Sequence, residues 1–254
     1  MKIFIAGGTS GIGLALAKKY LALGYDVAIC GRNKEKIKAI TTVPRLKIYQ
    51  LDIYNKDEFY KAVYDFSNGN LDLLISVAGI YVNSRTKPLS TEESSSMLKT
   101  NIVGTLNSFE IGRELMLNNN SGHIVAIASV AGLIDYPRAS VYSRTKKTVI
   151  SIADSYREAL KNTNIKISTI IPGYVDTKRL RELNNGDVSK KIFLISEEEA
   201  VNLIIDAITK NKKEFIFPFK MKILIKFLNL LPKKLLTFLL NDTNYKGEKI
   251  TNDI

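Results

Sequence analysis

The glycine-rich segment Gly7-Gly8-Thr9-Ser10-Gly11-Ile12-Gly13 constrains the fold more than any other stretch of the chain. It follows the apolar run 2–6, which is typical of a strand, and it leads into a segment with helical periodicity at 11–23. The first, third and fourth glycines permit a tight bend, close approach of a phosphate to the backbone, and close helix–strand contact. A helix that starts inside such a turn offers free N–H groups and the positive end of its dipole to a phosphate. The segment therefore predicts a dinucleotide site at the first strand of a sheet.

Short apolar runs alternate with longer amphipathic segments along the rest of the chain. Strands are predicted at 2–6, 25–30, 46–51, 71–77, 122–128, 165–171 and 214–217. Helices are predicted at 11–23, 34–40, 56–66, 91–117, 138–161 and 197–210. This alternation indicates a Rossmann-like, doubly wound α/β fold, with a parallel sheet of about seven strands and helices on both faces.

The 254 residues, 45% of them hydrophobic, suit one α/β domain with a full core and small appendages. We expect a nucleotide-binding and catalytic domain at 1–217 and a C-terminal extension at 218–254. The single cysteine, Cys30, excludes an internal disulfide and a zinc cluster, so no metal site is predicted. Its apolar surroundings indicate a buried strand thiol.

The net charge of +12 raises nucleic acid and anionic membranes as partners. The lysines are widely spread and no nucleic-acid-binding motif is present, so we do not expect a nucleic-acid partner. Since the chain starts directly with a strand, no signal peptide is expected and a cytoplasmic location is predicted. No apolar run is long enough to span a bilayer.

The second predicted strand ends at Gly31-Arg32-Asn33, the place that faces the adenosine ribose in sheets of this type. An acidic residue there would bind the 2′-hydroxyl, and none is present. Arg32 can instead grip a 2′-phosphate with its planar guanidinium, which favours NADP(H) and leaves NAD(H) as the alternative. Arg32 could also be an ordinary solvated arginine. Asp52 is placed to meet the adenine edge, or is an ordinary helix-start aspartate.

Tyr142 and Lys146 are four residues apart in a predicted helix, so their side chains share one face. A nearby positive charge favours the tyrosinate, so we expect Lys146 and a cationic nicotinamide together to lower the pKa of Tyr142. Tyr142 can then exchange a proton with a carbonyl or alcohol oxygen. Ser129, at the end of a predicted strand, can hold the same oxygen by a hydrogen bond. A Tyr–Lys pair alone is usually a surface pair, but this one occurs together with Ser129 and the glycine turn.

These motifs resemble those of the short-chain dehydrogenase/reductase family. Ala6–Gly13 resembles the family's TGxxxGxG, with Ala6 in place of threonine, and Tyr142–Lys146 matches YxxxK. Ser129 and Asn101 stand at the family's serine and asparagine positions, and Pro172–Thr177 resembles PGxVxT. One departure is Ser76-Val77-Ala78-Gly79, where the family has NNAG, so that Val77 lacks an amide that supports the sheet.

The resemblance implies an NADP(H)-dependent oxidoreductase that interconverts a ketone or aldehyde and an alcohol, and a homodimer or homotetramer. It implies catalytic roles for Asn101, Ser129, Tyr142 and Lys146, with Asn101 holding Lys146 through water and Lys146 also binding the nicotinamide ribose. Beyond the glycine turn and Arg32, the cofactor-binding residues implied are Asp52, Ile53, Ala78, Gly79, Tyr142, Lys146, Pro172, Gly173, Val175 and Thr177. A non-catalytic NADP(H)-binding regulatory or scaffold protein is the alternative.

Residues 215–240 combine apolar residues with lysines, and Pro232 is expected to start a second helix there. Such a pair of helices, with lysines on a narrow face, could lie on a membrane, cover the substrate cleft, or form a subunit interface. Membrane contact would favour a hydrophobic substrate. The polar segment 176–195 suits a mobile lid, and the tail 241–254 is expected to fray. His123, the only histidine, is interpreted as structural.

Overall fold

The computed structural model of the chain describes residues 1–82, 88–137 and 139–240. Its central feature is a seven-stranded sheet in the order β3-β2-β1-β4-β5-β6-β9. All neighbouring strands in this sheet are parallel, which confirms the predicted doubly wound α/β fold. The strands are β1 (Lys2–Ala6), β2 (Asp26–Gly31), β3 (Leu46–Gln50), β4 (Leu73–Ser76), β5 (Gly122–Ile127), β6 (Ile165–Pro172) and β9 (Glu214–Phe217).

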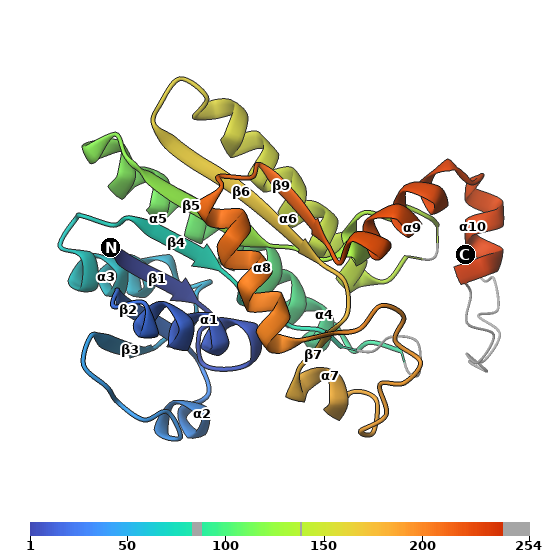
Figure 1. Ribbon diagram of the computed structural model, residues 1–254, viewed down its shortest axis with the longest axis horizontal. Helices are drawn as coiled ribbons and strands as arrows, with labels where there is room; N and C mark the ends of the chain where they lie inside the picture. The colour runs from blue at the N-terminus through green and yellow to red at the C-terminus, as the bar shows by residue number, and fades with distance from the viewer. Residues whose placement is uncertain (83–87, 138, 241–254) are drawn as a thin grey trace.

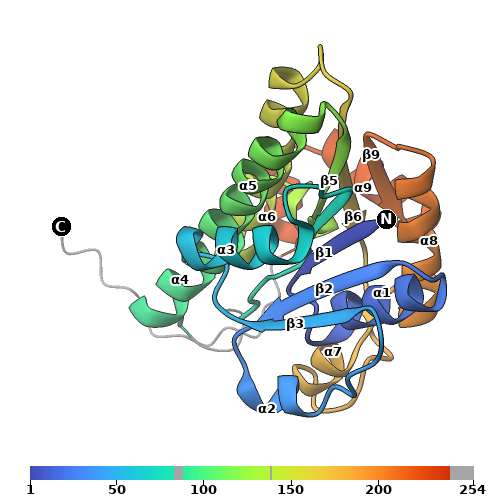
Figure 2. The same ribbon diagram turned by 90° about the vertical axis from the view of Figure 1, so that its left-hand side faces the viewer.

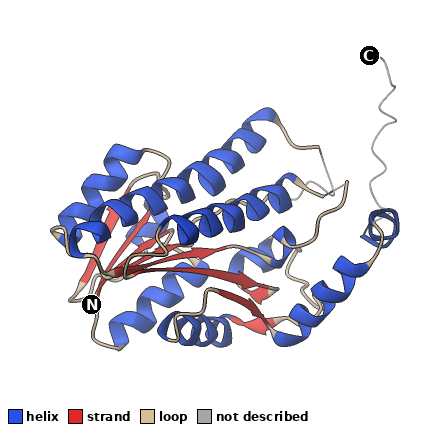
Figure 3. Cartoon of the chain, turned by 90° about the horizontal axis from the view of Figure 1, so that it is seen from above, coloured by secondary structure: helices blue, strands red, loops and turns tan. Residues whose placement is uncertain are grey.

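Helices cover both faces of the sheet, as Figures 2 and 3 show. One face carries α1 (Gly11–Ala22) and α8 (Glu197–Thr209), and the other carries α3 (Lys56–Ser67), α5 (Gly104–Asn119) and α6 (Val141–Ala159). The side chains of a strand alternate between the two faces. In β1, Ile3 and Ile5 pack with α1 and α8, whereas Phe4 and Ala6 pack with α3 and α5. The short helix α2 (Lys34–Lys38) follows β2.

Two predicted elements differ from those observed. The single helix expected at 91–117 is divided into α4 (Thr91–Leu98), a π-helical turn at Lys99–Val103, and α5. The helix expected near 138–161 is α6, which begins at Val141 because the Ser140 side chain accepts a hydrogen bond from the Ser143 N–H. Arg138 itself lies outside the described residues.

The segment expected to be an irregular lid contains regular structure. It includes β7 (Val175–Asp176), α7 (Lys178–Glu182) and β8 (Ile195–Ser196), and β7 pairs with β8 in parallel. Two-residue strands are too short to produce a recognisable alternation of apolar and polar residues. Whether this segment moves as a lid stays a prediction.

Two helices follow β9, namely α9 (Phe219–Leu230) and α10 (Lys233–Leu240). Pro232 stands between them, directly before the first residue of α10, as expected from the sequence. Figure 1 shows both helices projecting from the body of the molecule beyond the carboxyl ends of the strands. The division of the chain at 217/218 stays a proposal, and the tail expected to fray, 241–254, lies outside the described residues. In the part that is described, no helix has the length and apolar character needed to cross a bilayer.

Candidate active site

The glycine turn lies at the carboxyl end of β1, between the loops that follow its two neighbours, β2 and β4. In a doubly wound sheet this is the point at which the order of strands reverses and where ligands bind. Gly7 has φ of +89°, and a Cβ there would stand 2.5 Å from the backbone nitrogen of Ala78. A Cβ at Gly13 would stand 2.3 Å from the Gly7 carbonyl oxygen. Both positions therefore require glycine for the turn to pack this closely.

The open side of this turn faces the loop after β6. The nearest side-chain atom to a Cβ built at Gly11 is the Thr177 Cγ2, at 4.0 Å, so backbone N–H groups at the start of α1 remain approachable there. Ser10 precedes α1 and its side chain makes no capping hydrogen bond. The structure thus leaves room for an anionic group at this helix N-terminus, where the dipole favours it.

The candidate residues for the adenosine end of a dinucleotide contact each other. Arg32, which follows β2, donates a hydrogen bond from Nη1 to the Asp52 Oδ2 at 3.1 Å. The Arg32 side chain is about half exposed, so it is accessible to a phosphate. This contact, in which Asp52 orients the guanidinium, is not indicated by the sequence. The Ile53 side chain is buried against Gly104, which leaves its backbone as the group that could meet an adenine.

Ser129 and Tyr142 are brought together from different elements. Ser129 follows β5 and precedes the 3-10 turn Val130–Gly132, where its Oγ accepts a hydrogen bond from the Ala131 N–H. Tyr142 lies in the first turn of α6 and shares a hydrogen bond with Ser129. The Tyr81 ring stands edge-on against the Tyr142 ring, with centroids 4.9 Å apart. Two hydroxyls are therefore held side by side, with the ring of one fixed by a second aromatic side chain.

Lys146 lies one turn further along α6 and is buried. Its Nζ donates a hydrogen bond to the Ile127 carbonyl oxygen at 2.9 Å and stands 5.9 Å from the centroid of the Tyr142 ring. Burial lowers the pKa of Lys146 to about 8, so the ammonium is still mostly charged at neutral pH.

In the protein alone the pKa of Tyr142 is not lowered, and the lowering expected from Lys146 together with a cationic nicotinamide stays a prediction. Burial raises the pKa of Tyr142 to about 12; the hydrogen bond with Ser129 opposes that rise and the neighbouring Tyr81 adds to it. The physical reason is that burial removes water from the tyrosinate anion, and the hydrogen bond with Ser129 offsets only part of that cost. The hydroxyl is therefore protonated near neutral pH.

Asn101 is fully buried within the π-helical turn, a kind of distortion that often occurs at functional sites. Its Oδ1 accepts a hydrogen bond from the Ile80 N–H at 2.7 Å, and its Nδ2 donates to the Ile80 carbonyl oxygen at 3.0 Å. The same Nδ2 donates to the Thr145 Oγ1 at 3.0 Å, and Thr145 in turn donates to the Tyr142 carbonyl oxygen. Asn101 thus connects the loop after β4 to the helix that carries Tyr142 and Lys146.

Gly79 lies between these groups. A Cβ there would stand 3.4 Å from the Lys146 Nζ and 3.5 Å from the Asn101 Oδ1. Residues Tyr81 and Thr145 were missed by sequence reasoning. In the sequence, Tyr81 is marked only by its position after the fourth strand, and Thr145 only by its position next to Lys146. Neither position by itself indicates a contact with the candidate site.

The segment after β6 closes the site on its other side. The Gly173 N–H donates a hydrogen bond to the Phe217 carbonyl oxygen at 2.7 Å, which connects the end of β6 to β9. Val175 is buried in β7, and the Thr177 side chain caps α7 by accepting a hydrogen bond from the Leu180 N–H. The backbone of Val175 and the exposed side of Thr177 are the parts of this segment that remain available to a ligand.

The departure at Ser76-Val77 has a structural counterpart. Ser108 of α5 donates a buried hydrogen bond to the Ser76 Oγ at 3.2 Å, while Val77 packs against the core shared with α1 and α8.

His123 is buried and its Nε2 lies 2.8 Å from the Ser168 Oγ on the neighbouring strand, which fits the structural role expected of it. Cys30 is fully buried, as predicted, and burial raises its thiol pKa to about 12.

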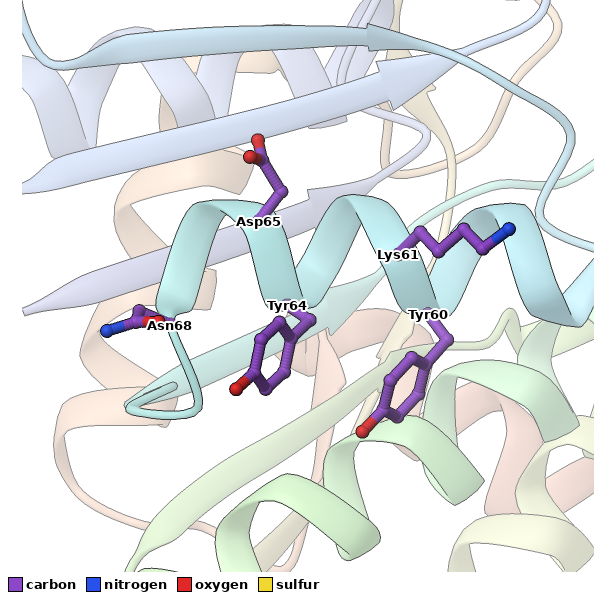
Figure 4. Close-up of a pocket in the computed structure, with 5 residues that line it drawn as sticks. All are labelled: Tyr60, Lys61, Tyr64, Asp65 and Asn68. Atoms are coloured by element: carbon purple, nitrogen blue, oxygen red, sulfur yellow. The ribbon is translucent and has the colours of Figure 1, made fainter.

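A shallow hollow lies away from this constellation, on the outside of α3, and Figure 4 shows its lining. Tyr60 and Tyr64 stack there with ring centroids 6.2 Å apart, beside Lys61, Asp65 and Asn68. None of the candidate catalytic or cofactor-binding residues lines it.

Across residues 1–82, 88–137 and 139–240, no group of three or more His, Cys, Asp or Glu side chains is arranged to hold a metal ion.

Comparison with known proteins places this site in a family. The family profile described as "short chain dehydrogenase" matches residues 1–187. An "uncharacterized oxidoreductase" of Staphylococcus aureus (strain USA300) is 30% identical over 213 residues, which cover 82% of this chain and 90% of the relative. A protein with the same description from Staphylococcus epidermidis (strain ATCC 12228 / FDA PCI 1200) is 30% identical over 212 residues, or 81% of this chain and 90% of the relative.

Solved structures agree with this assignment. The structure described as "ElxO with NADP Bound" is 25% identical, has a TM-score of 0.75, and is matched over 85% of this chain and 96% of its own. A short chain dehydrogenase from Burkholderia cenocepacia J2315 in complex with NADP has a TM-score of 0.78 over 94% of this chain and 97% of its own. At 21% identity, that second likeness shows the fold alone. The chain belongs to the short-chain dehydrogenase family and is an oxidoreductase of that family.

Proposed function

We propose that the protein is an NADP(H)-dependent oxidoreductase that reduces a hydrophobic ketone or aldehyde to the alcohol, in a reaction that is reversible. The observation that carries the proposal is the convergence of Ser129, Tyr142 and Lys146 at the carboxyl ends of the strands. Asn101 supports that arrangement through Ile80 and Thr145. In this architecture the same edge of the sheet holds the dinucleotide, so proton transfer and hydride transfer can occur at one place.

The chain fits a dinucleotide phosphate on three structural grounds. The turn at Gly7–Gly13 brings backbone together so closely that a Cβ at either end would collide with it. The N-terminus of α1 points its free N–H groups into that turn. Arg32, oriented by Asp52, is available for a 2′-phosphate, and the structure of ElxO holds NADP. When bound, the nicotinamide would supply or accept the hydride.

The remaining candidate residues would line the same groove. Thr9, Ser10, Ile12, Ile53, Ala78 and Gly79 belong to the turn and to the loops beside it, and Pro172, Gly173, Val175 and Thr177 belong to the segment after β6. We propose that Lys146 also binds the ribose next to the nicotinamide, since its ammonium is buried beside Gly79.

In reduction, Tyr142 would donate its proton to the carbonyl oxygen while Ser129 holds that oxygen by a hydrogen bond. The raised pKa of Tyr142 keeps its hydroxyl protonated at neutral pH, which is the state that a proton donor needs. Lys146 remains charged and would stabilise the tyrosinate left after the transfer. The protein alone is therefore in the protonation state that proton donation to a carbonyl oxygen requires.

Two measurements test the proposal. Titration by nicotinamide fluorescence should show tight binding of NADPH and weak binding of NADH. Tyr142→Phe should then lower the turnover of carbonyl substrates by about 10²–10⁴-fold, the usual contribution of general acid catalysis, while NADPH binding is largely retained. Tyr64→Phe, on the exposed side of α3, is the matched control and should keep full activity.

The outcomes separate this proposal from its rival. Substantial turnover in Tyr142→Phe would refute the role given to that hydroxyl. Tight NADPH binding without turnover of any carbonyl or alcohol would favour a non-catalytic, NADP(H)-binding regulatory or scaffold protein. A preference for NADH would refute the role of Arg32.

For its assembly and surroundings, we propose a homodimer or homotetramer in the cytoplasm, with peripheral membrane contact through 219–240 and no nucleic-acid partner. Sedimentation of the purified protein tests the oligomeric state. A salt-sensitive shift in mobility with duplex or single-stranded nucleic acid would contradict the absence of a nucleic-acid partner.

A further inference from the structure

The C-terminal helices present an apolar stripe to solvent. In α9, Phe219, Ile223, Phe227 and Leu230 are spaced so that they fall on one face of the helix, and their exposed fractions are 70%, 54%, 59% and 83%. In α10, Phe238 is 77% exposed and Leu239 is 54% exposed. Exposed apolar residues that gather in this way mark an interaction site, whereas isolated ones are ordinary. These six side chains are called the apolar stripe below.

The stripe is not the result of a loosely attached helix, because the opposite face of α9 is packed. Met221 and Ile225 are buried, and Met221 lies against Gly173, where an added Cβ would be 3.2 Å from the Met221 Cγ. At the other end of the helix, Asn229 donates a hydrogen bond from Nδ2 to the Leu133 carbonyl oxygen at 3.1 Å. The docked face therefore fixes which side chains point outward.

Positive charge borders the stripe. Residues 218–240 contain five lysines and neither aspartate nor glutamate. At helical spacing, Lys222 and Lys226 run along one edge of the stripe in α9 and Lys220 lies at the other, while Lys233 and Lys234 open α10. A lysine at the edge of an apolar face can lay its methylene chain along that face and raise its ammonium to meet an anion.

This charge pattern decides between the candidate occupants of the stripe. A second copy of the chain, related by a two-fold axis, would bring the same lysines toward one another without a carboxylate of this segment to pair them. The tail 241–254 is mostly polar in sequence and offers little apolar surface to cover the stripe. An anionic lipid surface matches both features, with acyl chains for the stripe and phosphate or carboxylate headgroups for the lysines.

We propose that the apolar stripe and its lysines dock the protein on an anionic bilayer, and that the enzyme takes a lipophilic carbonyl compound from that bilayer. The second part rests on the proposed function. It follows from where α9 is anchored, since Gly173 belongs to the candidate cofactor site and Leu133 lies just after Ser129. As Figures 1 and 3 show, α9 and α10 lie beyond the carboxyl ends of the strands, the end of the molecule that holds the candidate site.

Docking is tested on the whole protein by co-sedimentation with vesicles of phosphatidylcholine, with and without phosphatidylserine. Each lysine near an anionic surface contributes about fivefold in affinity. The three lysines of α9 alone should therefore favour the anionic vesicles by about 100-fold. The double variant Phe227→Glu/Leu230→Glu should abolish binding, because it places carboxylates within the stripe. The control Leu23→Glu changes an exposed leucine directly after α1 and should leave binding unchanged. Lys226→Glu should weaken binding, whereas Lys161→Glu, at an exposed lysine after α6, should not.

The two parts of the proposal fail in different ways. No binding to anionic vesicles, or a lipid-free dimer that the double variant disrupts, would overturn docking whatever the enzymatic activity. If docking holds, reduction of a long-chain methyl ketone dissolved in the vesicles should fall in the double variant, while reduction of a short, water-soluble diketone should not. Equal loss on both substrates would overturn delivery from the bilayer. Vesicle binding without turnover of any carbonyl or alcohol would leave docking supported and would refute the proposed function.

Discussion

Replacement of Asn101 by alanine tests the buried connection between the loop after β4 and α6. The substitution removes an acceptor for the Ile80 N–H and donors for the Ile80 carbonyl oxygen and the Thr145 hydroxyl. Thr145 keeps its bond to the Tyr142 carbonyl oxygen, so the two backbone groups of Ile80 are the ones left without a partner. The variant is expected to be less stable, and the loop and the helix are expected to separate more easily.

The size of this effect follows from the cost of an unpaired buried polar group, about 1–3 kcal/mol each. Ile80 is only half-buried, so water can reach part of the space, and the lower end of that range applies to both groups. The free energy of unfolding should therefore fall by about 2 kcal/mol. For a chain of this length, that corresponds to a decrease of about 4–8 °C in Tm.

Urea unfolding at one fixed protein concentration, followed by circular dichroism, measures the change. Asn119→Ala is the matched control, since Asn119 also bonds two groups, Gly69 and Asn70, but does so at the exposed end of α5. Its effect should stay within about 0.5 kcal/mol, as for surface substitutions in general. Equal effects for the two variants, or a loss at Asn101 well under 1 kcal/mol, would refute the reasoning.

Two further predictions concern charge. Arg32→Ala should weaken NADPH binding by about 10–100-fold, the value of a charge-assisted hydrogen bond, and should leave NADH binding nearly unchanged; equal weakening of both in fluorescence titrations would show that Arg32 does not read the 2′-phosphate. His123 has its pKa lowered from 6.5 to about 4 by burial, so its contribution to stability is complete above pH 6.5 and is lost as the pH falls through 4. The protein should lose up to about 3 kcal/mol more than His123→Gln between pH 7 and pH 4. NMR titration of this single histidine checks the pKa, and a value near 6.5 would contradict the burial argument.

Much of the fold could be predicted because its signals are local. Most strands of the large sheet are short apolar runs, and the long helices have apolar faces, so their existence and order follow from periodicity. The interruption of the helix at 91–117 and the short strands β7 and β8 could not be predicted in this way. The π-helical turn at Lys99–Val103 depends on the side chain of Asn101 bonding a distant loop, and the pairing of β7 with β8 depends on where the chain returns after α7.

The candidate site shows the same limit. Ser129, Tyr142, Lys146 and Asn101 could be selected from their motifs, but the environment of Tyr142 could not. Its pKa rises because the folded chain removes its hydroxyl from water and brings Tyr81 against its ring. Neither this burial nor the contact with Tyr81 can be recognised from the sequence around residue 142.

The sequence by itself determined the elements, their order, the glycine turn and the residue types for proton transfer, since periodicity, backbone freedom and side-chain chemistry are properties of short segments. Tertiary structure alone decided which groups meet: Arg32 with Asp52, Asn101 with Ile80 and Thr145, and α9 with Gly173 and Leu133. It also decided which face of α9 is left in solvent. The physical reason is that burial, hydrogen-bond pairing and the pKa values that depend on them arise between segments far apart in the chain, and they exist only once those segments have packed.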